Sequence, residues 1–273
     1  MNASILMVLL GTASCGIGGW LYFQRYEMPR PPLGVLNLGD VAFTFACIII
    51  VPILYLLLPI WFVMGLLLLA SFSLVYFALE PMLPRALVWG LTTLLMGADL
   101  AAGFALGTDH PGFLVVNNLV VIISVISIAN AWTGSGMKAR EAAILSGLLI
   151  GYDFIATAQL SVMGDLFTRL TALPLAPMVA WGQGQAYASI ALGDLLLLTL
   201  FPLTLWKGYG AKAGLIALGV GLAAVALLMV VPRSGLFPLM VVLGPLMVVQ
   251  YLWWGRNRPE RKWKEFRAAA KPR

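Results

Sequence analysis

The chain has 273 residues, of which 61% are hydrophobic and only 10% are charged, and its formal net charge is +6. An ordinary soluble domain carries roughly 25% charged residues, so this composition excludes a soluble globular protein and indicates a polytopic membrane protein. Residues 256–273 hold eight basic and two acidic side chains, which account for the whole net charge. The remaining membrane body is neutral, so no nucleic-acid partner is expected.

Nine apolar runs in the sequence are long enough to cross about 30 Å of hydrocarbon. In chain order they cover residues 3–23, 41–59, 60–79, 86–106, 114–133, 141–163, 185–206, 212–231 and 236–254. Leu58-Pro59-Ile60 divides the second run from the third, since residues 41–79 are too many for one crossing. We therefore expect an all-α polytopic membrane protein with nine transmembrane helices in one domain, 1–255, followed by a basic tail, 256–273.

Basic residues in the connections predict the orientation, because Lys and Arg are retained on the cytoplasmic side. The connections after the first, third, fifth and seventh runs, together with the tail, hold 15 of the 17 Lys and Arg residues, and the opposite connections hold Arg169 and Arg233. The N-terminus is therefore expected outside and the C-terminus in the cytoplasm, where the tail also contacts anionic lipid. "MNAS" lacks the basic residue of a cleaved signal, so residues 1–23 are interpreted as the first span.

The side chains that usually bind metals are few. Cys15 and Cys47 lie within expected spans, and the single histidine, His110, lies in an outer loop. These residues form no group with metal-ligand spacing. Neither a metal nor another cofactor is expected.

The connection between the sixth and seventh runs, residues 164–184, is unusually apolar for a loop. Pro174 and Pro177 forbid a regular helix there, and each proline favours an extended conformation in the residue before it. We expect an outer loop with a possible short strand at the membrane face. The alternative is an apolar loop that lies flat on the bilayer surface.

Three acidic residues fall deep within the expected spans: Asp99 in the fourth, Asp153 in the sixth and Asp194 in the seventh. A charge at the centre of a membrane helix costs about 2.5–3.5 kcal/mol on insertion scales, so a partner or a function must offset it. Asp153 follows Arg140 by 13 residues, and Asp194 precedes Lys207 by 13 residues. Both carboxyls are therefore expected about 20 Å from the cytoplasmic anchors, where they can face each other.

Two adjacent carboxyls cannot both ionise freely, so they share a proton. One then acts as a base that activates water and the other as an acid that polarises a carbonyl, as in aspartic proteases. Asp99 lies at about the same depth, but it stands among the small residues of "LLMGADLAAG", a pattern typical of helix contacts. Gly193 allows close backbone approach to Asp194, and Tyr152 next to Asp153 carries a hydroxyl donor. We expect Asp153 and Asp194 to form the pair and Asp99 to be structural.

Three short stretches carry a resemblance to a known family. "GYDFIAT" (151–157) resembles the YD motif and "ALGD" (191–194) the GxGD motif of the presenilin and signal peptide peptidase family of intramembrane aspartyl proteases. "FPLMVVLGP" (237–245) is similar to the stretch that holds the family's PAL motif. The resemblance covers residues 145–265. Ala191 stands in place of the first glycine of GxGD, and Leu239 and Met240 replace the last two residues of PAL.

The resemblance implies a presenilin-like fold and an Asp/Asp dyad that hydrolyses peptide bonds within transmembrane segments. It implies that Asp153 and Asp194 are catalytic, that Tyr152 and Gly193 support them, and that two segments bind substrate. The substrate-binding residues are Pro238, Leu239 and Met240 in one segment and Leu173, Pro174 and Leu175 in the other, where a strand pairs with the unwound substrate.

The expected orientation is that of the signal peptide peptidase branch, whose substrates are single membrane-spanning segments with cytoplasmic N-termini. The resemblance then implies the plasma membrane in a prokaryote and the endoplasmic reticulum or another internal membrane otherwise. The sequence predicts no oligomeric state.

Other functions stay open from the sequence. A proton-coupled transporter also uses intramembrane acids, although the chain has no paired pattern of broken helices in two halves. A prepilin-type peptidase shares the GxGD aspartate, but "GDLLLLTLF" lacks the lysine that usually follows it. A catalytically inactive relative that binds membrane segments is the remaining alternative.

Overall fold

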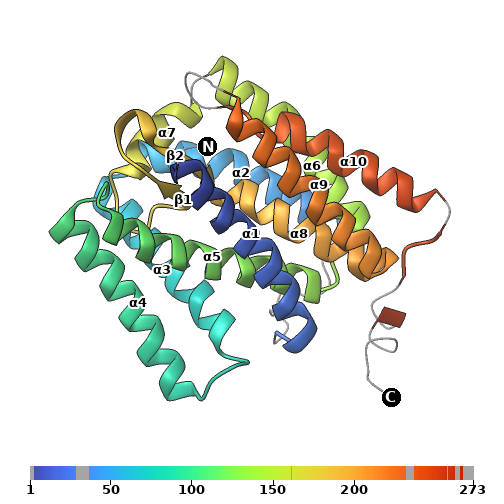
Figure 1. The fold of residues 1–273 in the computed structure, drawn as a ribbon, viewed down its shortest axis with the longest axis horizontal. Helices are drawn as coiled ribbons and strands as arrows, with labels where there is room; N and C mark the ends of the chain where they lie inside the picture. The colour runs from blue at the N-terminus through green and yellow to red at the C-terminus, as the bar shows by residue number, and fades with distance from the viewer. Residues whose placement is uncertain are drawn as a thin grey trace.

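The computed structural model describes residues 3–28, 37–160, 162–231, 237–256, 258–261 and 265–266, and within these ranges the chain is helical apart from one small sheet (Figure 1). The α-helices are α1 (Ala3–Arg25), α2 (Leu38–Leu57), α3 (Ile60–Leu79), α4 (Arg85–Leu106), α5 (Pro111–Gly134), α6 (Ala139–Asp153), α7 (Val162–Thr171), α8 (Leu192–Tyr209), α9 (Ala211–Val230) and α10 (Met240–Gly255). A π-helix, η1 (Phe154–Gln159), a 3₁₀ turn, η2 (Gly184–Ala186), and the strands β1 (Met178–Trp181) and β2 (Ala188–Ala191) complete it.

The protein is an all-α polytopic membrane protein, as predicted. Within the described ranges, α1 to α5 and α9 are long and apolar enough to cross a bilayer, and the bent pair of α6 and α7 gives a seventh candidate. The predicted break between the second and third spans is confirmed, because α2 ends at Leu57 and α3 begins at Ile60. α8 and α10, with 18 and 16 residues, are shorter than the ~20 residues of a straight crossing. The count of nine spans stays a prediction.

The sixth expected span is not one continuous helix. α6 ends at Asp153, the chain continues as η1, and α7 then turns away at 82°. The guanidinium of Arg169, on α7, donates hydrogen bonds to the carbonyls of Leu56 and Leu58 at the end of α2. α7 therefore caps α2, and residues 164–171 of the expected outer loop are helical. The sequence did not predict this bend, because its residues are as apolar as those of the helices on either side.

α8 lies at the centre of the bundle, where it packs against α1, α5, α6 and α9 (Figure 1). Its residues are apolar on all sides and nearly all are buried between Leu195 and Leu205, as expected for a helix without a solvent face. Gly214 of α9 permits close contact, because an added Cβ there would lie 2.7 Å from the Pro202 carbonyl oxygen. Among the described helices, α8, which carries Asp194 in its first turn, is thus the most enclosed.

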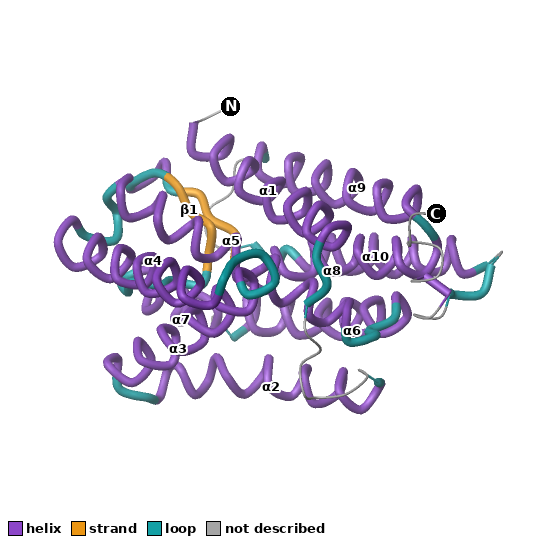
Figure 2. Tube along the Cα trace, turned by 90° about the horizontal axis from the view of Figure 1, so that it is seen from below, coloured by secondary structure: helices purple, strands orange, loops and turns teal. Residues whose placement is uncertain are grey.

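The two strands lie at one end of the bundle, beside the start of α1 and against α5 (Figure 2). β1 and β2 are antiparallel, with Val179 opposite Ile190 and Ala180 opposite Ser189. A short strand is thus present in the predicted outer loop, and its partner β2 occupies the start of the seventh expected span. β2 leads directly into α8.

Two asparagines of α5 hold the other edge of β1. The Asn118 side-chain amide donates to the Ala180 carbonyl at 2.8 Å and accepts from the Ala180 N–H at 2.9 Å, as a neighbouring strand would. Asn117 donates to the carbonyls of Ala176 and Met178, both at 3.1 Å. β1 therefore has partners on both edges.

We expect Asn118→Leu to destabilise the protein, because it leaves both buried backbone groups of Ala180 without a partner. Each such group costs about 1–3 kcal/mol, so the free energy of unfolding should fall by about 2–6 kcal/mol. Thermal unfolding in detergent measures the effect. Val115→Ala, on the exposed side of α5, is the control and should change stability by less than about 0.5 kcal/mol; equal midpoints for the two variants would contradict the role given to Asn118.

Candidate active site

Asp153 and Asp194 belong to two helices that pack against each other. Asp153 is the last residue of α6, and Asp194 lies in the first turn of α8. The structure therefore places the two acids that the sequence paired on neighbouring helices.

The Asp153 carboxylate accepts two hydrogen bonds. Oδ1 accepts from the Thr157 hydroxyl and Oδ2 from the backbone N–H of Met240, each at 2.9 Å. Met240 is the first residue of α10, and the first N–H groups of a helix have no partner within it. Asp153 therefore caps α10, and the PAL-like segment is joined to the acid through its backbone.

Asp194 has a different environment. It lies in the first turn of α8, where the positive end of the helix dipole favours a carboxylate. The described residues donate no hydrogen bond to its side chain, which is half-buried. A Cβ added at Gly193 would meet nothing within 4 Å, so the close backbone approach expected at this glycine is absent and open space adjoins Gly193.

The cost of placing two carboxyls among apolar helices is thus offset by two helix N-termini. The N-terminus of α10 meets Asp153 and that of α8 contains Asp194. Each interaction of this kind is worth about 0.3–1 kcal/mol when exposed and up to ~2 kcal/mol when partly buried. The pair is stabilised without a basic side chain among the hydrogen-bond partners of either acid in the described ranges.

Tyr152 does not support Asp153 in the way that its hydroxyl donor suggested. That hydroxyl donates to the Ile48 carbonyl of α2 at 3.1 Å, and its ring packs edge-on against Phe45. Tyr152 therefore ties α2 to α6. It acts on the site only through the placement of helices.

Asp99 is fully buried in α4, and its Oδ1 accepts a hydrogen bond from the Leu175 N–H at 2.8 Å. Leu175 has a φ of 59°, a left-handed conformation that a non-glycine residue adopts only when its surroundings hold it. Asp99 thus fixes the turn that leads into β1. This contact agrees with the structural role expected for Asp99.

The two segments expected to bind substrate differ in accessibility. Leu173, Pro174 and Leu175 are all buried, so their side chains face the interior and offer no docking surface. Pro238 and Leu239 are half-buried, and Met240 is buried. Of the two segments, the second is the one bonded to an acid of the pair.

Gly244 allows α10 to approach α6 closely near Asp153. A Cβ added there would lie 2.4 Å from Ile150 Cγ1 and 2.9 Å from the Ser146 carbonyl oxygen. We expect Gly244→Ala to lower the free energy of unfolding by about 1–3 kcal/mol through overpacking. Thermal unfolding in detergent measures the change.

Gly147, on the α6 side of the same interface, provides the matched control. A Cβ added there would lie 3.7 Å from Val248 Cγ2, an ordinary contact. Gly147→Ala should leave the unfolding midpoint unchanged or raise it, because alanine favours helix over glycine. A loss of stability as large as that of Gly244→Ala would contradict the close contact described for Gly244.

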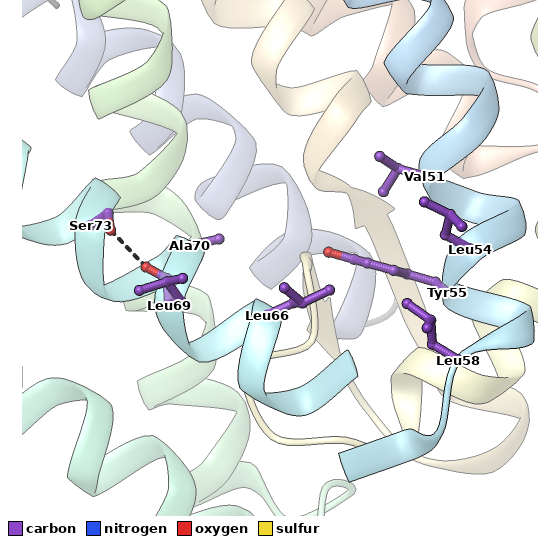
Figure 3. Close-up of a pocket in the computed structure, with 8 residues that line it drawn as sticks. All are labelled: Val51, Leu54, Tyr55, Leu58, Leu66, Leu69, Ala70 and Ser73. Atoms are coloured by element: carbon purple, nitrogen blue, oxygen red, sulfur yellow. Dashed lines mark hydrogen bonds between the residues drawn. The ribbon is translucent and has the colours of Figure 1, made fainter. Parts of the chain in front are cut away.

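An apolar groove of about 320 Å³ lies between α2 and α3 (Figure 3). Its lining residues are Val51, Leu54, Tyr55, Leu58, Leu66, Leu69, Ala70 and Ser73. The Ser73 hydroxyl donates to the Leu69 carbonyl within α3, and the Tyr55 hydroxyl is the other polar side-chain group of the lining (Figure 3). None of the three intramembrane aspartates lines it.

Thr157 and the Met240 N–H are partners of Asp153 that sequence reasoning did not assign. For Thr157 a signal existed, because residues four apart on a helix lie on one face. For Met240 the only signal was its place in the PAL-like stretch, because every residue except proline carries a backbone N–H.

Compared with protein-family models, the sequence matches none, and no curated protein matches it either. The functional proposal therefore depends on the geometry of Asp153, Asp194 and Met240.

Proposed function

We propose that the protein is an intramembrane aspartyl endopeptidase, which hydrolyses peptide bonds within transmembrane segments of membrane proteins or signal peptides. The observation that carries the proposal is that Asp153 ends α6 and Asp194 lies in the first turn of α8, two helices that pack together, with the Met240 N–H bonded to Asp153. Nine spans, an outer N-terminus and a cytoplasmic C-terminus belong to the same proposal.

The unequal surroundings of the two acids assign their roles. Hydrogen bonds donated to a carboxylate favour its charged form, so Asp153, with two donors, is the base that takes a proton from water. Asp194 holds the proton of the pair and donates it to the substrate carbonyl oxygen as the water oxygen bonds to the carbonyl carbon. Collapse of the resulting diol breaks the C–N bond. The proton gained by Asp153 passes to the amine nitrogen, and a diol hydroxyl returns a proton to Asp194 as it becomes the new carbonyl.

A helical substrate must unwind before water can reach its carbonyls, and β2 offers a strand edge for the unwound segment. The Ala180 backbone groups point away from β2, toward Asn118. In an antiparallel pair the facing residue, Ser189, then directs its own N–H and carbonyl to the opposite edge. The described residues make no hydrogen bond to the Ser189 N–H. A substrate strand added there would lie next to Asp194.

A proton-coupled transporter would use all three intramembrane aspartates as a relay. Asp99 is instead bonded to the Leu175 N–H in a separate part of the core, which favours the peptidase. The expected partners are transmembrane-helix substrates and, at the basic tail, anionic lipid.

Cleavage of a model membrane-spanning peptide by the purified protein in liposomes tests the proposal. Mass spectrometry should find products cut within the membrane segment. A folded protein that cuts no such peptide, across a panel of segments in both orientations, would contradict it.

A further inference from the structure

The segment that follows α10 contacts two helices at the same end of the bundle. Oε1 of Glu260 accepts from the N–H of Ala139, the first residue of α6, at 2.7 Å. The Arg261 N–H donates to the Gly208 carbonyl at 3.0 Å, and Arg261 Nη2 donates to the Trp206 carbonyl at 2.9 Å. These contacts satisfy groups at the start of α6 and the end of α8. We call Glu260 and Arg261 the C-terminal clasp.

The clasp is closely packed against α8. A Cβ added at Gly208 would lie 2.8 Å from Glu260 Cγ, so a glycine is needed for this approach. Burial raises the pKa of the Glu260 carboxyl, while the Ala139 N–H and the positive charge of Lys207 lower it. The half-buried carboxylate thus has both a hydrogen-bond donor and a cation nearby.

Aromatic contacts hold the same segment from its other side. Phe266 stacks on Phe23 of α1, with ring centroids 5.6 Å apart, and meets Trp206 edge-on. The Arg261 guanidinium lies 5.9 Å from the Phe266 ring centroid, a cation–π distance. The segment is therefore docked through specific contacts.

The residues that the clasp contacts on α6 and α8 lie at equal sequence separations from the two acids. Fourteen positions separate Ala139 from Asp153, and fourteen separate Asp194 from Gly208. At 1.5 Å per residue each stretch spans about 21 Å. α6 and α8 pack together. When the clasp holds the start of α6 level with the end of α8, the equal helix lengths place the Asp153 and Asp194 carboxyls at one level at the opposite end. A slip of one residue in either helix would displace its acid by about 1.5 Å.

We propose that Glu260 and Arg261 are positioning residues that fix the axial register of α6 against α8, and thereby the approach of Asp153 to Asp194. The catalytic consequence rests on the proposed peptidase function. The register itself does not depend on it and can be measured separately.

The experiment combines a distance and a rate. Gly151 and Gly193, near the two acids, have open space around an added Cβ, so both accept a spin label as cysteines in a Cys15→Ala, Cys47→Ala background. In Glu260→Ala and Arg261→Ala, electron–electron double resonance should find a label distance that is shifted or broadened relative to the parent. In the unlabelled variants, kcat for peptide cleavage should fall roughly ten- to a hundredfold with KM unchanged.

Two variants serve as controls. Glu260→Gln keeps an acceptor for the Ala139 N–H, and Arg258→Ala removes an exposed neighbouring charge; both should retain the parental distance and most of kcat. If Glu260→Ala does not fold, Arg261→Ala, which keeps the backbone bond to Gly208, decides the question. Parental distance and kcat in the folded clasp variants would overturn the proposal. A parent that cleaves nothing, with clasp variants that still shift the distance, would refute the peptidase function alone.

Discussion

Asp153→Asn and Asp194→Asn should each lower the rate of peptide cleavage by about 10²–10⁴-fold, because general acid–base catalysis contributes that much and each change removes half of the proton-sharing pair. In Asp153→Asn the new side-chain amide oxygen can still accept a hydrogen bond from Thr157 or from the Met240 N–H, so the fold should persist. Cleavage in liposomes and thermal unfolding, measured on the same preparations, separate lost chemistry from lost structure.

Asp99→Asn is the matched control for these substitutions. An asparagine at this position keeps an acceptor for the Leu175 N–H, so this variant should retain most of the activity. Loss of cleavage in Asp99→Asn, together with full cleavage in Asp194→Asn, would show that the dyad is assigned to the wrong acids.

Ser189→Pro should lower kcat/KM by roughly ten- to a hundredfold, since one hydrogen bond of about 1.4 kcal/mol is a factor of ten and the ring also obstructs the edge. Proline removes the N–H that faces away from β1, and edge strands tolerate proline at such positions. The bonds between Val179 and Ile190, and between Trp181 and Ala188, on the opposite edge of β2, are left in place. The measurement is cleavage of the same peptide over a range of peptide concentrations.

Ser189→Ala separates the backbone from the side chain at this position. It keeps the N–H and removes only the hydroxyl, so activity should stay near the parental value. Equal losses in the two variants would mean that the side chain acts and that no substrate strand pairs with β2.

Length and apolarity predicted the helices well, because a membrane helix must satisfy its own backbone within about 20 residues. Pro59 marked the break between α2 and α3, since proline disfavours a helical conformation in the residue before it, and Leu58 is extended. The turn after Asp153 had no such mark, because Phe154, Ile155 and Ala156 continue the apolar pattern. Its cause is tertiary: Arg169 is held by the end of α2.

The placement of Asp153 and Asp194 on neighbouring helices could be predicted, because their depths follow from counting along the chain. Their partners could not, since they lie far away in the sequence and are backbone groups: Met240 is 87 residues from Asp153, and Ile48 is 104 residues from Tyr152. The basic tail was expected to orient the chain and to contact lipid. Its first residues also include Glu260, whose carboxylate caps α6; the net charge of the tail gave no sign of this role.

The central claim, that Asp153 and Asp194 meet, is tested most directly by cross-linking their positions. In a Cys15→Ala, Cys47→Ala background, Asp153→Cys/Asp194→Cys should be joined within one chain by a short methanethiosulfonate cross-linker, as detected by mass spectrometry of the intact protein. Asp99→Cys/Asp194→Cys should remain unjoined under the same conditions. Cross-linking of the second pair and not of the first would contradict the account.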